Sequence, residues 1–312
     1  MVTMGAAGIR AVLIAGPTAS GKSALAVEIA RRCGGTVVNA DSMQVYADLR
    51  IITARPTRDE EAVVPHRLYG HVDGAVNYSA MRYVADVAGV LTELGRGGSL
   101  PVLVGGTGLY FKALTEGFSA IPPVPDAVRI AFRARVAEQE TSLLHAELSC
   151  LDPAMAERLK PGDRMRIMRA LEVHEATGRS IASFQGEREP GPLDGLPLLR
   201  LFVSPERAEV RARIDRRFEA MIAQGALDEV AALRARGLDP LLPVMRAHGV
   251  PGLIAHLDGT VGLNDAIARG QADTRAYAKR QTTWFRHQMA GWQAVEPHAA
   301  LDMALRGLDA AG

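Results

Sequence analysis

Residues 11–32 read AVLIAGPTASGKSALAVEIARR and contain three predicted elements: a strand, a glycine-rich loop and a helix. This stretch begins with a short apolar run, residues 11–15, typical of a buried strand in a parallel sheet. The pattern G-x-x-x-x-G-K-S follows, and then residues 24–32, in which Leu25, Ile29 and Ala30 recur at helical spacing. Strand, glycine-rich loop and helix therefore come in the order of a phosphate-binding loop. We expect that loop to consist of Gly16, Pro17, Thr18, Ala19, Ser20, Gly21, Lys22 and Ser23.

Further strands and helices extend this unit along the chain. Apolar runs at residues 36–40 and 101–104 predict two more strands, and residues 198–203 predict a third. Ser79 is the expected cap of a helix over residues 79–94. Strands that alternate with helices indicate an α/β fold in three layers with a parallel sheet. We therefore predict a P-loop NTPase-like core.

The middle of the chain follows a different pattern. Residues 121–125 form a proline-rich linker, and residues 126–184 are almost entirely helical in pattern. We divide the chain into a catalytic core of residues 1–118 and 198–312 and a mainly helical insertion domain of residues 119–197. Within the second part of the core, helices are expected over residues 206–222, 227–236, 253–256 and 265–289, whereas the last dozen residues give no clear signal.

Composition and charge exclude several classes of protein. Of the 312 residues 48% are hydrophobic and 23% are charged, which suits a folded globular chain. The formal net charge is only +1, so a polyanion would have to bind where basic residues gather on one face. Cys33 and Cys150 have no metal-binding spacing, and the N-terminal apolar run is too short for a secretory signal or a membrane span. We expect a cytoplasmic protein with no membrane segment.

The phosphate loop predicts binding of a di- or triphosphate. Its backbone N–H groups and the positive end of the following helix dipole point toward an anion, and Lys22 adds a point charge. Ser23 is the expected ligand of a Mg²⁺ ion that bridges two phosphates. A chance match on a solvent loop is disfavoured because the strand and the helix flank the motif correctly. The eight residues do not distinguish pyrophosphate from a nucleotide.

Two further segments end predicted strands at the edge of the sheet that faces the phosphate loop. Asp41 follows residues 36–40 and is open to three roles: a Mg²⁺ partner outside the first coordination sphere, a general base, or the N-cap of a turn. Thr107 lies in the turn formed by residues 105–108, G-G-T-G, where the glycines permit close backbone approach and the hydroxyl can contact a ligand. A plain turn from strand to helix remains the alternative for that segment.

Basic residues gather in three places against the neutral background. The insertion contains Arg164, Arg166 and Arg169, and residues 272–287 place cations on one helix face and aromatic side chains on another. The predicted helix over residues 206–222 has more arginines than acids. Each cluster could be a solvated surface with salt bridges, although arginine beside aromatic residues also suits RNA.

Taken together, five segments resemble the tRNA dimethylallyltransferase family, also called tRNA isopentenyltransferases, over nearly the whole chain. They are the phosphate loop, residues 41–46 (D-S-M-Q-V-Y), residues 104–110 (V-G-G-T-G-L-Y), residues 166–172 together with residues 177–179 (T-G-R), and residues 277–286 (Y-A-K-R-Q-T-T-W-F-R). The chain departs from the family pattern at Ala47, Asp48, Ile52 and Val250.

The resemblance implies transfer of a dimethylallyl group from dimethylallyl pyrophosphate to the N6 amine of an adenosine 3′ to the anticodon, with release of pyrophosphate. Lys22, Ser23 with Mg²⁺, and Arg213 would hold the leaving group, with Arg216 or Arg217 as alternatives to Arg213. Asp41 would accept a proton from the amine. The enzyme would be a monomer. Positions matching the family's tRNA contacts are Asp41, Ser42, Met43, Gln44, Thr107, Arg129, Met165, Arg166, Ile167, Met168, Arg169, Arg246 and Gly249.

Three other functions compete with this interpretation. A small-molecule kinase or nucleotidase could share the fold, since fold alone does not fix function. A related prenyltransferase could use free AMP as acceptor, as cytokinin-forming enzymes do, but the basic segments argue against it. A non-catalytic RNA-binding protein would need neither Asp41 nor an intact phosphate loop.

Overall fold

The computed structural model of the protein describes residues 8–186 and 188–310. They form two compact units: one contains the chain up to Glu116 and from Pro192 on, and the other is Gly117–Gly191. The boundaries lie two and six residues earlier than residues 118 and 197, where the sequence placed them. The short strands β5 (Phe118–Ser119) and β6 (Arg188–Glu189) pair with each other and so belong to the second unit. The N–H of Leu193 donates to the carbonyl of Leu114 at 2.9 Å, which ties the returning chain to the first unit.

The first unit is built on a six-stranded sheet in the order β3-β2-β4-β1-β7-β8. Every pairing in it is parallel, with Val12 opposite Val102 on one side of β1 and opposite Leu199 on the other. The predicted parallel sheet is therefore confirmed, and β1 lies inside it. Its strands are β1 (Ala11–Ala15), β2 (Gly35–Asn39), β3 (His66–Arg67), β4 (Leu100–Gly105), β7 (Leu198–Val203) and β8 (Gln293–Val295).

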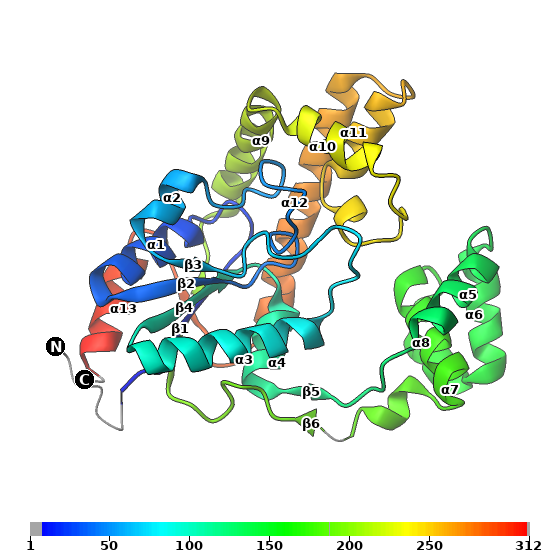
Figure 1. Cartoon of the computed structure of the whole chain (residues 1–312), viewed down its shortest axis with the longest axis horizontal. Coiled ribbons are helices and arrows are strands. Elements are labelled where there is room, and N and C mark those ends of the chain that lie inside the picture. The colour runs from blue at the N-terminus through cyan, green and yellow to red at the C-terminus, as the bar shows by residue number, and fades with distance from the viewer. Residues whose placement is uncertain (1–7, 187, 311–312) are drawn as a thin grey trace. The chain divides into compact units, whose positions relative to one another are not determined.

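Helices cover both faces of this sheet, as Figure 1 shows. One face carries α1 (Lys22–Cys33) and α13 (Ala300–Asp309), and the other carries α3 (Ala80–Gly97) and α4 (Gly108–Glu116). Val12 and Ile14 of β1 pack in one buried cluster with Ile29 of α1 and Ala304 of α13. Because β1 is buried on both faces, its sequence is a continuous apolar run rather than an alternating one.

Most elements lie where the sequence predicted them. The strands β1 and β7 have the predicted bounds, and Ser79 caps α3 by accepting a hydrogen bond from the N–H of Arg82. Elements missed from the sequence include α13 and four short strands: β3 and β8, two or three residues long at the sheet edges, and β5 and β6 of the second unit. Helix α13 buries Ala300 and Ala304 and packs Leu301, Met303 and Leu308 beside them, so its helical apolar spacing was present in the sequence and was overlooked. A further short helix is α2 (Arg58–Val63).

A group of helices packs over the carboxyl end of the sheet in the same unit. It consists of α9 (Arg207–Ala223), α10 (Ala226–Ala235), the 3-10 turn η2 (Val244–Arg246), α11 (Val250–Leu257) and α12 (Leu263–Gln288). Their buried side chains form one cluster with residues that follow β2, among them Tyr46 and Leu49. Phe218 of α9 lies in this cluster, 3% exposed. The cluster thus fixes the segment after β2 against α9 and α12.

The second unit is helical, as predicted. Its elements are α5 (Asp126–Val136), α6 (Thr141–Leu151), α7 (Pro153–Arg158), α8 (Arg164–Thr177) and the 3-10 turn η1 (Ile181–Phe184). Helix α8 supplies much of its core, including Ile167, Leu171 and Val173. Glu172 is buried there and forms an ion pair with Arg133 at 3.1 Å. Among the residues that the structure describes in both units, no helix is long and apolar enough to span a membrane.

Candidate active site

The phosphate loop connects β1 to α1 at the carboxyl edge of the sheet. A Cβ atom on Gly16 would lie 2.8 Å from the carbonyl oxygen of Val203, so glycine is required for the loop to leave β1 this close to β7. Ala19 and Gly21 both have left-handed backbone conformations, with φ of 63° and 87°. The turn brings the first backbone N–H groups of α1 around the loop, where they suit an anion.

Lys22 lies at the start of α1 and turns back over the loop. Its ammonium group donates to the carbonyl of Pro17 at 3.1 Å. Burial of the ammonium lowers the pKa of Lys22 to about 8, while the charge of Asp41 acts in the opposite direction and that of Arg217 lowers the pKa further. An anion bound in the loop would stabilise the protonated form, so phosphate binding and protonation of Lys22 favour each other.

Asp41 follows β2 at the same edge of the sheet and is only partly exposed. Its Oδ1 accepts the N–H of Met43 at 2.9 Å, and its own N–H donates to Oδ1 of Asn39 at 2.9 Å. The turn-capping role considered for Asp41 is therefore present. It occupies one carboxylate oxygen, and within the described parts of the chain Oδ2 has no hydrogen-bond partner. Capping fixes the carboxylate and leaves Oδ2 for a substrate.

Thr107 ties the end of β4 to this segment. Its hydroxyl oxygen accepts the N–H of Ser42 at 2.9 Å and donates to the Ser42 hydroxyl at 3.2 Å. A Cβ atom on Gly105 would lie 2.0 Å from the carbonyl oxygen of Ala40, so the glycine permits the ends of β2 and β4 to meet. Thr107 thus positions the residue next to Asp41.

Two arginines of α9, Arg213 and Arg217, differ in the groups that their guanidinium groups contact. Arg217 donates to the hydroxyl of Thr18 in the phosphate loop and interacts electrostatically with Asp41. Burial of its guanidinium lowers its pKa. Arg213, one turn earlier, forms an ion pair with Glu209 and reaches only the carbonyl of Ala19, at 3.5 Å. Both arginines thus reach the phosphate loop, but only Arg217, which the sequence left as an alternative to Arg213, is buried there beside Asp41 and donates to a loop side chain.

A cavity of about 70 Å³ lies where these groups converge. Its lining includes Thr18, Asp41 and Arg217 on one side. His248 and Tyr277 lie on another side, with ring centroids 4.5 Å apart and an interplanar angle of 42°. Burial lowers the pKa of His248 and raises the pKa of Tyr277. The remaining wall is largely apolar, formed by Met43, Ile52, Ile214, Phe218, Met221 and Ala247 with Thr53 and Thr274.

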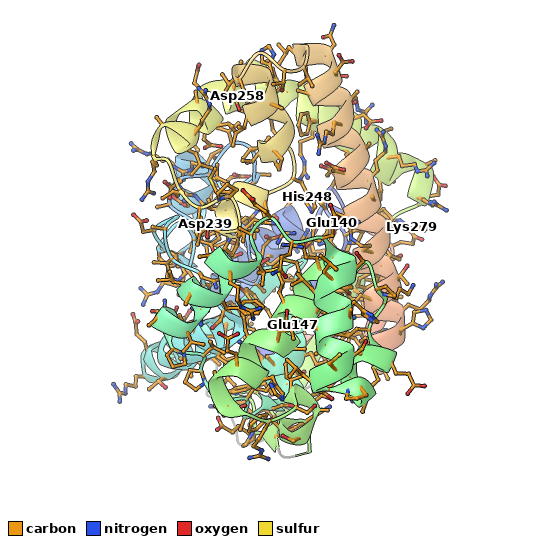
Figure 2. All side chains as sticks on the ribbon, turned by 90° about the vertical axis from the view of Figure 1, so that its right-hand side faces the viewer. Glu140, Glu147, Asp239, His248, Asp258 and Lys279 are labelled. Carbon is orange, nitrogen blue, oxygen red and sulfur yellow. The ribbon has the colours of Figure 1, made fainter. Side chains whose placement is uncertain are left out.

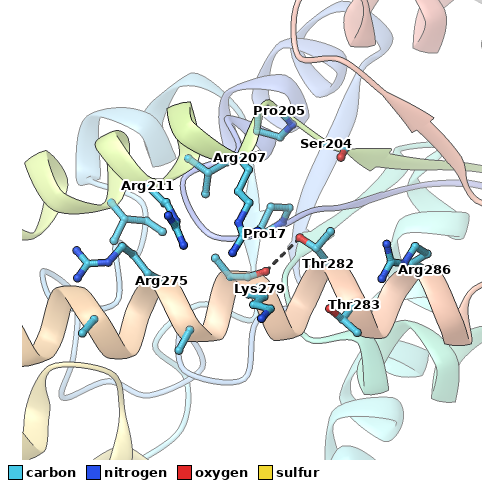
Figure 3. A pocket seen from close by; sticks show the side chains of 15 residues that line it. Pro17, Ser204, Pro205, Arg207, Arg211, Arg275, Lys279, Thr282, Thr283 and Arg286 are labelled. Atoms are coloured by element: carbon cyan, nitrogen blue, oxygen red, sulfur yellow. Dashed lines mark hydrogen bonds between the residues drawn. The ribbon is translucent and has the colours of Figure 1, made fainter.

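A larger cavity of about 590 Å³ lies between α9 and α12 on another side of the phosphate loop. Figure 3 shows its basic lining: Arg207, Arg211, Arg275, Lys279 and Arg286. Pro17 of the loop and Ile214 also line it, and Ile214 lines the smaller cavity as well. In Figure 2, His248 and Lys279 lie on opposite sides of α12. The basic pattern noted in residues 272–287 therefore surrounds a cavity next to the loop, where it attracts anions.

The predicted tRNA-contacting residues of the first unit differ in burial and in the hydrogen bonds that their side chains make within the protein. The side-chain amide of Gln44 donates to the carbonyls of Thr53 and Ala54, each at 2.9 Å, and so braces the loop after β2. Arg246 is exposed. Gly249 is buried with φ of 95°, and a Cβ atom there would lie 2.9 Å from the ring of Phe218.

In the second unit, the predicted residues fall on both faces of α8. Ile167 and Met168 are 0% and 3% exposed, so their side chains form core and do not reach a partner. Arg166 and Met165 are exposed, and Arg169 is half-exposed and 4.0 Å from Glu172. Arg129 donates to Asp126 at 2.7 Å and to the carbonyl of Val124 at 3.0 Å. Arg166 and Met165 are thus the exposed members of the predicted set on α8.

A divalent cation fits the phosphate loop through one protein ligand. The hydroxyl of Ser23 is exposed in the first turn of α1, next to the anion position. Within residues 8–186 and 188–310, no group of three or more His, Cys, Asp or Glu side chains could hold a metal. Mg²⁺ commonly uses few protein ligands together with phosphate oxygens and water, and a hydroxyl oxygen is a suitable hard ligand. The residues present therefore fit an ion that arrives with the diphosphate.

Two family models match the chain. The one described as IPP transferase matches residues 44–288, and the one described as isopentenyl transferase matches residues 9–77. Among curated proteins, a tRNA dimethylallyltransferase of Methylobacterium radiotolerans is 67% identical over 291 residues, covering 93% of this chain and 94% of the relative. One from a Bradyrhizobium species is 60% identical and covers 93% of this chain and 95% of the relative.

Solved structures are similar over the same length. The full-length tRNA isopentenylpyrophosphate transferase of Bacillus halodurans is 32% identical, with a TM-score of 0.68 and coverage of 96% of this chain and 97% of that one. A eukaryotic dimethylallyltransferase acting on tRNA is 26% identical, with a TM-score of 0.73 and coverage of 95% of this chain and 75% of that one.

Proposed function

The chain belongs to the tRNA dimethylallyltransferase family, and we propose from this premise how its residues transfer a dimethylallyl group from dimethylallyl pyrophosphate to the N6 amine of an adenosine 3′ to the anticodon. The observation that carries the proposal is that a phosphate loop, an inward-facing arginine and a fixed carboxylate converge on one cavity, where Thr18, Arg217 and Asp41 are neighbours.

The leaving group binds in the phosphate loop. During transfer the bond between the allylic carbon and the pyrophosphate oxygen breaks, and its electron pair leaves with the pyrophosphate. The loop N–H groups, Lys22 and Arg217 stabilise that developing charge, which is the largest contribution such a site makes to rate. Ser23 would hold a Mg²⁺ ion, which would supply additional positive charge to stabilise the leaving pyrophosphate.

The nucleophile is the exocyclic amine of the adenine. Its nitrogen forms the new bond to the allylic carbon, and Oδ2 of Asp41 accepts the proton that the amine loses. Because Oδ1 is held by the N–H of Met43, the carboxylate keeps one orientation. The apolar wall of the cavity, formed by Phe218 and its neighbours, suits the dimethylallyl chain and excludes water from the allylic cation.

The acceptor must leave its stack to enter the site. Extruding one base costs about a few kcal/mol, which contacts elsewhere on the tRNA must offset. The exposed Arg166 and half-exposed Arg169 of the helical unit and the exposed Arg246 of the first unit suit the phosphate backbone. We further propose that the enzyme acts as a monomer in the cytoplasm.

A three-way acceptor assay tests this function. The protein is incubated with dimethylallyl pyrophosphate and Mg²⁺, with unmodified tRNA, AMP or no acceptor, and released pyrophosphate is measured against incorporated prenyl group. We expect equal amounts of both products with tRNA and neither with AMP. Turnover with AMP would change the acceptor, and ATP hydrolysis without prenyl transfer would indicate a nucleotidase and refute the proposal.

A further inference from the structure

Gln281 of α12 contacts both the phosphate loop and the turn after β4, although it lies 263 residues beyond Thr18 in the chain. Its Oε1 accepts the N–H of Thr18 at 2.9 Å, and its Nε2 donates to the carbonyl of Gly106 at 2.9 Å. The residue is 5% exposed, one of the few buried polar side chains in the described parts of the chain. Backbone partners of opposite kind on the two sides fix which way the amide points.

The approach of Gln281 to the turn after β4 depends on a glycine. A Cβ atom on Gly106 would lie 2.0 Å from Nε2 of Gln281, so any other residue there would displace the amide. Leaving either end of this amide buried without a partner would be destabilising, which favours both hydrogen bonds being made. The side chain is therefore a rigid link between α12, the phosphate loop and the turn.

Both segments that Gln281 contacts are hydrogen-bonded in turn to residues at or next to the proposed site of reaction. On one side, Thr18 also accepts a hydrogen bond from Arg217, the proposed partner of the leaving pyrophosphate. On the other side, the residue after Gly106 is Thr107, whose hydroxyl holds Ser42, the neighbour of Asp41. The side chain of Tyr277 is within hydrogen-bonding reach of Thr107 and Gln281 and completes the contact.

We propose that Gln281 is a positioning residue that sets the separation between the phosphate loop and the Asp41 segment, so that leaving group and base are aligned for one reaction. The inference rests on the proposed function. Because a misplacement of about 1 Å can cost about 10²-fold in rate, a link of this kind acts on turnover more than on tRNA binding.

The test compares Gln281→Met with Gln288→Met. Methionine has a similar length and cannot make either hydrogen bond, and Gln288 is an exposed residue of the same helix whose amide oxygen accepts from Lys112. We expect Gln281→Met to lower kcat by about 10- to 100-fold and to weaken binding of inorganic diphosphate, measured by calorimetry, by about 10-fold. The KM for tRNA should stay within about twofold, and Gln288→Met should match the wild type throughout.

A double-mutant cycle separates positioning from a general loss of structure. If Gln281 acts by aligning Asp41, Gln281→Met should lower kcat far less in an Asp41→Asn background than in the wild type. Equal losses in both backgrounds, or a Gln281→Met variant that behaves like Gln288→Met, would overturn the proposal.

A second variant with a shorter side chain, Gln281→Asn, tests the proposal if Gln281→Met does not fold. Gln281→Asn keeps a buried amide that is too short to reach Thr18 and Gly106 together, and we expect it to show the same fall in kcat; wild-type kcat in this variant would count against the link. If the wild-type protein had no transferase activity, the proposed function would be contradicted. The diphosphate affinities of the wild type and Gln281→Met would then still test whether Gln281 positions the phosphate loop.

Discussion

Arg217 gives the sharpest test of how the leaving group is held. Replacing it by glutamine removes the charge that contacts Thr18 and faces Asp41 while keeping most of the side-chain length. Removing one preorganised group that stabilises developing charge costs about 10²- to 10³-fold in kcat, equivalent to about 2.7–4 kcal/mol. We therefore expect Arg217→Gln to lower kcat/KM for dimethylallyl pyrophosphate by that factor. Arg217 also lowers the pKa of Lys22, so the variant should raise it.

Two arginines of the same helix serve as matched controls. Arg216 is exposed, and Arg213 is engaged mainly by Glu209. Steady-state kinetics at saturating tRNA should place Arg216→Gln within about threefold of the wild type, because exposed charges contribute little. Arg213→Gln should fall between the two. A large loss in Arg213→Gln with little change in Arg217→Gln would refute the assignment and return the role to Arg213.

Three further results are expected. Asp41→Asn should lower kcat by about 10²- to 10⁴-fold, the usual contribution of a general base, with unchanged tRNA affinity in a filter-binding assay, and a near-normal rate would remove Asp41 from this role. Diphosphate affinity should decline as the pH rises through about 8, because the free enzyme then loses the Lys22 charge, and titration calorimetry of Lys22→Arg should show no such decline in that range. Joint replacement of Arg166 and Arg169 by alanine should weaken tRNA binding and reduce its salt slope by about 2 without altering diphosphate affinity; an unchanged slope would place the RNA elsewhere.

The sequence predicted the parts of the fold and site that are local. The phosphate loop was identifiable because strand, loop and helix are contiguous, and the helix after Ser79 because its cap is adjacent. The mainly apolar residues 198–203 marked β7 correctly although Arg200 interrupts them, and Leu201, Phe202 and Val203 are buried. Motifs whose residues are neighbours in the sequence can be identified without knowing how the elements pack.

What the sequence could not give depends on how distant elements meet. Arg213 and Arg217 are equivalent in a helical pattern, and only the packing of α9 against the loop separates them. Gln281 lies within a basic and aromatic segment, and nothing in the sequence pattern shows that this one amide is buried and linked to the phosphate loop. Ile167 and Met168 were placed among tRNA contacts by resemblance, but they face the core of the helical unit.

The most direct test of the account is mass spectrometry of the modified RNA. Unmodified tRNA is incubated with the protein, dimethylallyl pyrophosphate and Mg²⁺, digested with a base-specific nuclease, and the fragments are sequenced by mass. The account predicts one added dimethylallyl group on the adenosine 3′ to the anticodon, and none in the Asp41→Asn variant. A prenyl group at another nucleotide, or unmodified tRNA beside prenylated AMP, would contradict it.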